Sequence, residues 1–158
     1  CVKIPWVMMS CNNRDKNPKS ILLENTYRWN HDKKHPHPHK ILKFRCRYDQ
    51  IEVKCIFKTE KFNGIDIHHP NKPVKDCITV DSISKKEQKL NPFYNNLRED
   101  DIKNGYLLCY HYRIISRENC QNKLKKHHQY LKFQLEDLMN FDYPEIIDET
   151  LKNKQINK

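Results

Sequence analysis

Seven cysteines are spread along this polar chain, and they constrain its fold more than any other feature. They stand at Cys1, Cys11, Cys46, Cys55, Cys77, Cys109 and Cys120 of 158 residues. Apolar residues make up only 37% of the chain and the mean hydropathy is −0.98, so material for one large core is scarce. Such a chain commonly needs cross-links in addition to its core. The sequence therefore predicts about three disulfides and one unpaired cysteine, without indicating which cysteines pair.

The cysteine spacing also bears on the compartment. No CxxC pair occurs, so a zinc ribbon or a thioredoxin-like site has little support. Dense, dispersed cysteines are typical of an oxidising environment. We interpret the start at Cys1, which lacks an initiator methionine and a long apolar segment, as a mature form without its signal peptide. Because no apolar stretch reaches about 18 residues, we expect a secreted protein with no membrane span.

The chain is strongly basic, and this property narrows the class of partner. It carries 30 Lys and Arg against 20 Asp and Glu, a formal net charge of +10. A surface of this charge attracts nucleic acid, acidic polysaccharide, anionic lipid or an acidic protein. Two basic clusters are candidate polyanion-binding sites, and the alternative for each is a solvated face. The clusters are Lys40, Lys43, Arg45 and Arg47, and Lys123, Lys125 and Lys126 followed by His127 and His128.

Helical signals recur along the chain. Asn17-Pro18 and Asn91-Pro92 each read as a helix cap followed by proline, and Ser84 with Glu87 resembles a capping box. Leu22, Leu23, Tyr27 and Trp29 would then share one helical face. Within 121–139, Leu124, His128, Leu131, Leu135 and Leu138 step by four and three, which predicts an amphipathic helix. A last helix would carry Ile146, Ile147 and Leu151.

Other segments are ambiguous or read as loops. Residues 40–62 fit both a helical and a strand period, and we favour the helix; 77–80 is a short strand or a linker. Proline alternation at 35–39, Asn63-Gly64 and 68–73 predict loops.

The predicted fold class is mainly α, as two pseudo-repeated helical modules cross-linked by disulfides. The alternative is α+β, with strands around 42–57 and 106–115.

An internal similarity supports the idea of two modules. Cys46, Tyr48 and Cys55 have a spacing close to that of Cys109, Tyr112 and Cys120, and each set follows an apolar lead. Self-similarity at a period of this kind suggests two copies of one unit. We therefore expect a Cys-bounded N-terminal segment at 1–16, a first Cys-Tyr-Cys module at 17–80, a second at 81–151 and a flexible tail at 152–158.

This double motif resembles the bicycle family, the secreted aphid salivary effectors named for two cysteine-tyrosine-cysteine motifs. The resemblance is carried by Cys46, Tyr48, Cys55, Cys109, Tyr112 and Cys120, and it covers little of the chain outside them. It implies release from the salivary gland into plant tissue and manipulation of host development or defence, such as gall formation. It implies no catalytic residues.

Histidine chemistry offers weaker hypotheses. His31, His35, His37 and His39 lie close together and are weak candidates for a metal site, but an extended loop provides no preformed ligand geometry. His111 with Lys125, Lys126 and His127 could serve a basic secreted ribonuclease, although no motif of such an enzyme is present.

We therefore expect a secreted effector that binds a host partner, with no catalysis and no cofactor. The alternatives are a polyanion or nucleic-acid binder and a ribonuclease. The odd cysteine could also link two chains.

Overall fold

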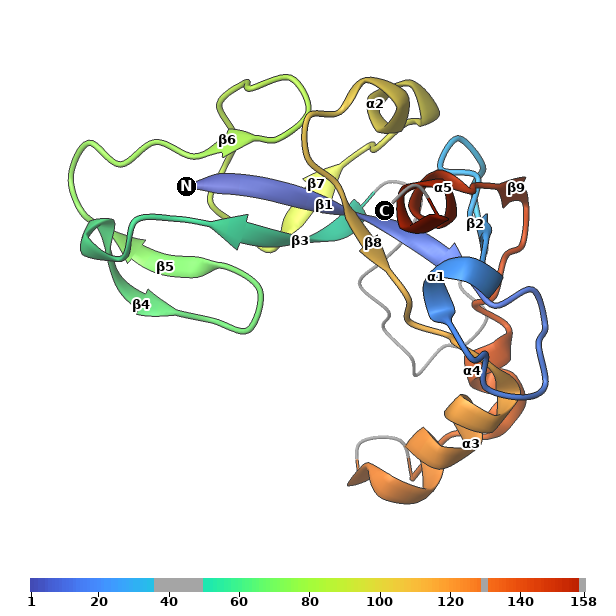
Figure 1. The fold of residues 1–158 in the computed structure, drawn as a ribbon. Coiled ribbons are helices and arrows are strands. Elements are labelled where there is room, and N and C mark those ends of the chain that lie inside the picture. The colour runs from blue at the N-terminus through green and yellow to red at the C-terminus, as the bar shows by residue number, and fades with distance from the viewer. Residues whose placement is uncertain (36–49, 129–130, 157–158) are drawn as a thin grey trace. The chain divides into compact units, whose positions relative to one another are not determined.

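The computed structural model describes residues 1–35, 50–128 and 131–156, which fall into two compact units (Figure 1). Among these residues, unit 1 contains 1–7, 31–35 and 50–109, and unit 2 contains 8–30, 110–128 and 131–156. Strand β1 (Val2–Ser10) belongs to both units, because the boundary falls after Val7. Every residue of β1 from Lys3 to Ser10 is buried. An almost unbroken apolar run of this kind is typical of a strand that is covered on both faces.

Unit 1 is built around the first half of β1. Strand β3 (Gln50–Ile56) pairs antiparallel to β1, with Val2 opposite Ile56, while β6 (Val80–Asp81) pairs parallel to β1. Strand β7 (Phe93–Asn95) pairs with β3, and α2 (Glu99–Asn104) follows it. The 3₁₀ turn η1 (Thr59–Lys61) leads into a hairpin of β4 (Phe62–Ile65) and β5 (Pro70–Pro73). The buried apolar side chains of this unit include Ile4, Trp6, Val7, Ile51, Val53, Ile83, Leu97 and Ile102.

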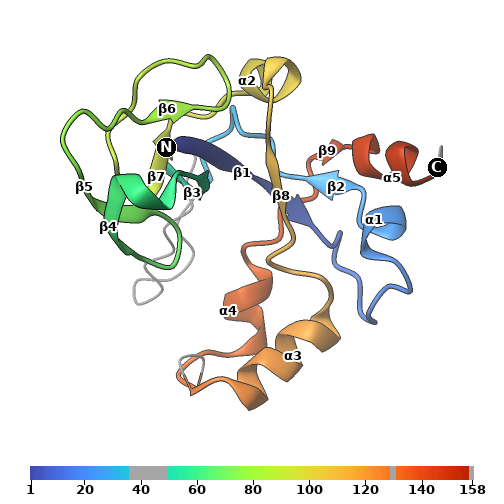
Figure 2. The same ribbon diagram turned by 60° about the vertical axis from the view of Figure 1, so that its left-hand side comes forward.

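Unit 2 uses the second half of β1. Strand β2 (Tyr27–Arg28) pairs with Met9 and Ser10, and β9 (Ile146–Ile147) pairs with β2. The helices are α1 (Ile21–Glu24), α3 (Arg117–Lys126), α4 (Leu135–Met139) and α5 (Thr150–Ile156). Helices α3 and α4 lie side by side (Figure 2). The buried apolar side chains include Met8, Met9, Trp29, Ile114, Leu138, Met139 and Phe141.

The protein is α+β, so the mainly α fold class was wrong. A sheet of seven strands has the order β7-β3-β1-β2-β9, and β6 and β8 (Cys109–His111) also pair with β1. Residues 50–56 form a strand rather than the favoured helix, because β3 receives hydrogen-bond partners from both β1 and β7. The α+β alternative is therefore confirmed, with strands at 50–56 and 109–111. The rest of the ambiguous segment, up to residue 49, lies outside the described residues.

Several predicted helices are shorter than expected or are strands. The helix predicted after Asn17-Pro18 is reduced to α1, since Tyr27 and Arg28 pair with β1 instead. Residues 93–95 are β7 and 146–147 are β9, and only the later parts of those predictions are helical. The continuous helix over 121–139 is instead α3 and α4 in two pieces.

Turn chemistry accounts for other differences. Ser84 starts no helix, because its hydroxyl and backbone N–H both donate to the Asp81 carboxylate. Asn63-Gly64 lies within β4, and part of the 68–73 loop is β5. Of the segment 77–80, which the sequence left open between a short strand and a linker, only Val80 belongs to a strand, β6. Each helix within 1–35, 50–128 and 131–156 is too short or too polar to cross a bilayer.

A buried lysine links β1 to the segment that precedes β7. The Lys3 side chain is 1% exposed, and its ammonium donates to the carbonyls of Lys89 (3.1 Å) and Phe93 and to Asn91 Oδ1 (2.9 Å). Burial lowers the pKa of Lys3, while Cys55 and the Asp81 carboxylate act in the opposite direction. Three acceptors from residues 89–93 are therefore satisfied by one side chain.

Replacing this ammonium tests its role in stability. The substitution Lys3→Met keeps most of the apolar stem but removes the ammonium donor from the carbonyls of Lys89 and Phe93 and from Asn91 Oδ1, which keeps the Phe93 N–H as its other donor. We therefore expect a loss of about 1–3 kcal/mol in the free energy of unfolding. Urea denaturation at neutral pH measures the loss. Lys103→Met, at a side chain that is 70% exposed, is the matched control and should change stability by less than about 0.5 kcal/mol. Equal effects of the two substitutions would contradict this role.

A buried ion pair joins β2 to the segment before α5. Arg28 Nε lies 2.7 Å from Asp148 Oδ2, and the two side chains are 7% and 8% exposed. Arg28 also donates to the carbonyl of Trp29 (3.0 Å). Burial alone would raise the pKa of Asp148, but hydrogen bonds from Thr150 and Arg28 outweigh it and lower that pKa. Asp148 is therefore ionised and paired at neutral pH.

Removal of the cation should be strongly destabilising and dependent on pH. Arg28→Met leaves the Asp148 carboxylate buried without its partner, which costs about 3–5 kcal/mol at pH 7. A lowered pKa in the folded state contributes stability above the unfolded pKa and loses it as the pH falls through the folded value. The difference between wild type and variant should therefore shrink only as the pH falls below about 4, from the ordinary value of 3.8 toward the lower folded pKa, as measured by urea unfolding. A difference that stays constant would show that Asp148 does not cause the loss.

Candidate functional site

Helix α3 carries the basic cluster that the structure describes. The Ser116 hydroxyl caps its first turn by accepting the Asn119 N–H (2.9 Å), and the helix ends at His127. Glu118 lies in the first turn, and Lys123, Lys125 and Lys126 lie in the last. This distribution complements the helix dipole, because anions are favoured at the N-terminus and cations at the C-terminus. The order of charged residues along the helix thus favours its formation and places the lysines at one end.

Two of the three lysines face solvent and the third does not. Lys125, Lys126, His127 and His128 are exposed, and we call these four residues the basic end of α3. The ammonium of Lys123 instead donates to the carbonyl of Arg113, and burial lowers its pKa. Lys123 therefore supports the local structure, while Lys125 and Lys126 are available to a partner.

Carboxylates around α3 and α4 are already engaged. Glu136 Oε1 accepts from Arg117 Nη1 at 2.7 Å, Glu118 accepts the Asn17 N–H at 2.9 Å, and Asp137 accepts the Gln134 N–H at 2.8 Å. In the part of the chain that the structure describes, Lys125 and Lys126 form no ion pair. The positive charge at this end of the helix is therefore not neutralised locally.

The other predicted sites divide between described and undescribed residues. Lys40, Lys43, Arg45, Arg47, Cys46, Tyr48, His37 and His39 lie outside the described residues. His31 is 1% exposed, and its backbone N–H donates to Glu99 Oε1 (2.7 Å). His35 is half-buried. Across 1–35, 50–128 and 131–156, no three His, Cys, Asp or Glu side chains are grouped so that they could hold a metal ion.

The ribonuclease candidates lie on different elements. His111 ends β8, which a loop joins to the first turn of α3, whereas Lys125, Lys126 and His127 lie at the last turn (Figure 2). A ten-residue helix is about 15 Å long. Since an acid, a base and a charge clamp must all reach one substrate group, this separation gives the ribonuclease hypothesis no support.

The cysteines do not form the predicted frame. Cys1, Cys11, Cys55, Cys77, Cys109 and Cys120 are free thiols, so the disulfide cross-links of the predicted fold class are absent among the described residues. Cys55 lies in β3 and Cys120 in α3, so the closing cysteines of the two motifs occupy different secondary structures. Tyr112 is half-buried; burial and the nearby Asp148 raise its pKa to about 12, so its hydroxyl stays protonated at neutral pH.

Cys11 lies in a buried polar cluster that the sequence did not indicate. Its backbone N–H donates to Asp142 Oδ1 (2.8 Å) and its thiol to Asp142 Oδ2 (3.2 Å), which also accepts the Asn13 N–H (2.9 Å). Burial, then the charge of Asp142 and the hydrogen bond to it, raise the pKa of Cys11 to about 12. Asp142 is therefore the acceptor that holds residues 11–13 in place.

The raised pKa predicts an unreactive thiol. At pH 8.5 a pKa of about 12 leaves about a thousandfold less thiolate than the ordinary cysteine value of 9.0, and Cys11 is also buried. Its alkylation by iodoacetamide should be at least about a hundredfold slower than that of Cys77, which is only half-buried. Peptide mass analysis after timed labelling gives both rates. In urea the two rates should converge. Asp142→Asn removes the carboxylate charge and should accelerate Cys11 labelling; an unchanged rate would contradict the role of Asp142.

Comparisons with protein-family models, with curated proteins and with solved structures found nothing that matches this chain. The assignment of a function therefore depends on the surfaces of the protein itself and on the motif resemblance.

Proposed function

We propose that this protein is a secreted effector that enters host plant tissue and acts by binding an acidic partner protein, without catalysis. The observation that carries the proposal is the basic end of α3, where Lys125 and Lys126 are exposed and form no ion pair within the described residues. The resemblance of the two cysteine-tyrosine-cysteine motifs to the bicycle family supports the effector role. The net charge of +10 supports an acidic partner.

The geometry of the basic end suits a docking contact. Helix α3 is fixed to its surroundings by the Arg117–Glu136 ion pair and by backbone hydrogen bonds from Arg117 to Arg14 (2.8 Å) and from Glu118 to Asp15 (2.9 Å). The lysines are thus presented from a well-anchored helix. Exposed charges of one sign increase the rate of association and select an oppositely charged partner more than they add affinity. We therefore expect binding that is fast and weakens with salt.

Charge reversal at the basic end provides the test. With poly-L-glutamate as a model acidic polypeptide, we expect the affinity of the wild type to fall steeply between 50 and 200 mM salt, roughly as a contact among exposed charges should. Lys125→Glu with Lys126→Glu should weaken binding about tenfold at the lower salt concentration, measured by fluorescence anisotropy.

Matched controls separate the site from the overall charge. Lys75→Glu with Lys89→Glu changes two exposed lysines of unit 1 and lowers the formal charge by the same amount. This control should bind like the wild type apart from a small uniform loss. Equal weakening in the two double variants would refute the basic end as the contact.

A single-stranded RNA of 20 nucleotides is the second probe. Tighter binding to this RNA than to poly-L-glutamate favours the nucleic-acid alternative. Cleavage of the RNA contradicts the absence of catalysis.

A further inference from the structure

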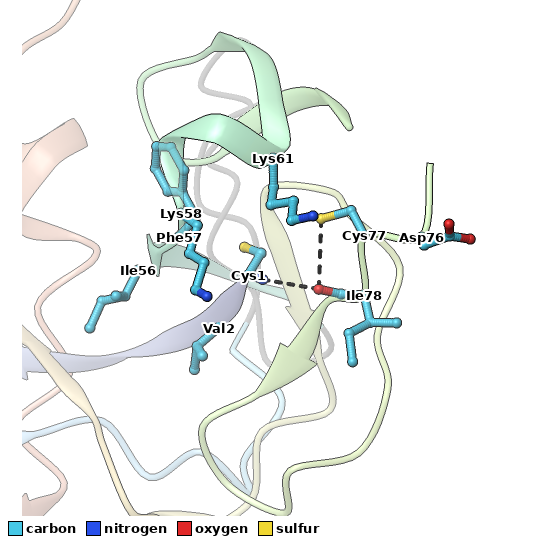
Figure 3. A pocket seen from close by; sticks show the side chains of 9 residues that line it. All are labelled: Cys1, Val2, Ile56, Phe57, Lys58, Lys61, Asp76, Cys77 and Ile78. Atoms are coloured by element: carbon cyan, nitrogen blue, oxygen red, sulfur yellow. Dashed lines mark hydrogen bonds between the residues drawn. The ribbon is translucent and has the colours of Figure 1, made fainter. Parts of the chain in front are cut away.

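Unit 1 contains a pocket that the basic end of α3 does not involve. It lies where the start of β1 meets the end of β3 and the segment before β6, and it has a volume of about 390 Å³ (Figure 3). Small-molecule pockets in proteins range over about 300–1,000 Å³ and are mostly apolar with a few polar groups. The size of this pocket is therefore that of a site for a small ligand.

The floor of the pocket is apolar and rests on paired strands. Val2 lies opposite Ile56 in the β1–β3 pair, and Phe57 follows Ile56. On the other side of the pocket, the backbone nitrogen of Cys1 donates to the carbonyl of Ile78 at 2.9 Å. The N–H of Val80 donates to the carbonyl of Cys1, also at 2.9 Å. Ile56 and Ile78 are nevertheless 58% and 64% exposed. Large apolar side chains are thus held open to solvent on a hydrogen-bonded frame, where burial by a ligand would be favourable.

Two lysines line the pocket from the start and the end of one turn. Lys58 precedes η1 and Lys61 is its last residue, and the N–H of Lys61 donates to the carbonyl of Lys58 at 3.0 Å. The two ammonium groups diverge: that of Lys58 lies toward Val2 and that of Lys61 toward Cys77, with Cys1 between them (Figure 3). The carbonyl of Lys61 accepts the Val74 N–H at 3.0 Å, which anchors the turn. Both lysines are exposed, and within the described residues neither forms an ion pair.

The third charged residue of the pocket points elsewhere. Asp76 lines the rim, but its carboxylate is directed away from Val2 and Cys1 (Figure 3). The pocket therefore combines an apolar floor with two cations, and the single carboxylate at its rim points away from the floor. This arrangement complements a molecule that is apolar at one end and negatively charged at the other.

We propose that this pocket binds a small amphipathic anion, whose apolar body covers Val2, Ile56 and Ile78 and whose carboxylate or sulfonate group lies between Lys58 and Lys61. The ligand is a free, monomeric molecule rather than a polymer, because the pocket is of limited volume. The site is independent of the acidic-partner contact on α3, which belongs to unit 2.

Two matched dyes test the proposal on the full chain. The probe 8-anilinonaphthalene-1-sulfonate has the required anionic group, and N-phenyl-1-naphthylamine has nearly the same rings without it. We expect the anionic dye to bind at one saturable site about tenfold more tightly than the neutral dye in fluorescence titrations. Decanoate should displace the anionic dye, whereas decanol should displace it far less well. Equal affinity for the two dyes, or many non-saturable sites, overturns the proposal.

Substitutions assign the binding to this pocket. Lys58→Met with Lys61→Met should lower the affinity for the anionic dye to about that for the neutral dye, without weakening the neutral dye. Asp76→Asn should tighten the anionic dye by about twofold, since it removes a like charge from the rim. Ile78→Asn should weaken both dyes.

A control outside the pocket keeps the two proposals distinguishable. Lys125→Glu with Lys126→Glu should leave dye binding unchanged, because those lysines belong to the basic end of α3. Urea unfolding confirms that each variant is folded. Dye binding that survives in the Lys58 and Lys61 variant, or that is lost in the Lys125 and Lys126 variant, overturns the assignment to this pocket.

Discussion

The fold depends on the burial of one strand. Strand β1 is apolar along nearly its whole length, and its backbone groups need partners on both sides. Strands β3, β2, β6 and β8 supply those partners from widely separated parts of the sequence. Because the first half of β1 belongs to unit 1 and the second half to unit 2, the same strand contributes to the core of each. Segments with weak or contradictory local signals become strands wherever they pair with it or with its neighbours.

Buried charged groups provide stability that the sequence had led us to assign to sulfur. Lys3 satisfies acceptors 86–90 residues away, Asp142 holds Cys11 and Asn13 across about 130 residues, and Arg28 pairs with Asp148. Breaking such a contact leaves a buried polar group without its partner, which costs more than the contact itself contributes. The scarcity of apolar residues thus indicated that apolar burial is supplemented by other interactions. In the described residues that support comes from hydrogen bonds and an ion pair.

The two proposed binding surfaces differ in their physics. The basic end of α3 consists of solvated lysines, so its contacts are long-range, sensitive to salt and tolerant of the partner's shape. The pocket of unit 1 offers exposed isoleucines and two lysines, so its affinity depends on apolar burial and its selectivity on charge. One surface suits an extended acidic polypeptide, and the other suits a small molecule. Each is contained within a single unit.

The sequence by itself determined the net charge, the basic cluster at 123–128, the presence of helix within 121–139 though not its division into α3 and α4, and the ambiguity of 50–56 between helix and strand. These features depend on composition and on spacing over a few residues. Tertiary structure decided that 50–56 and Tyr27–Arg28 are strands, because their backbone partners come from β1 and β7, between 17 and about 50 residues away. It also decided that Lys123 turns inward while Lys125 stays exposed. The pocket could not be predicted, since Val2, Lys58 and Ile78 come together only when β1, β3 and β6 pair.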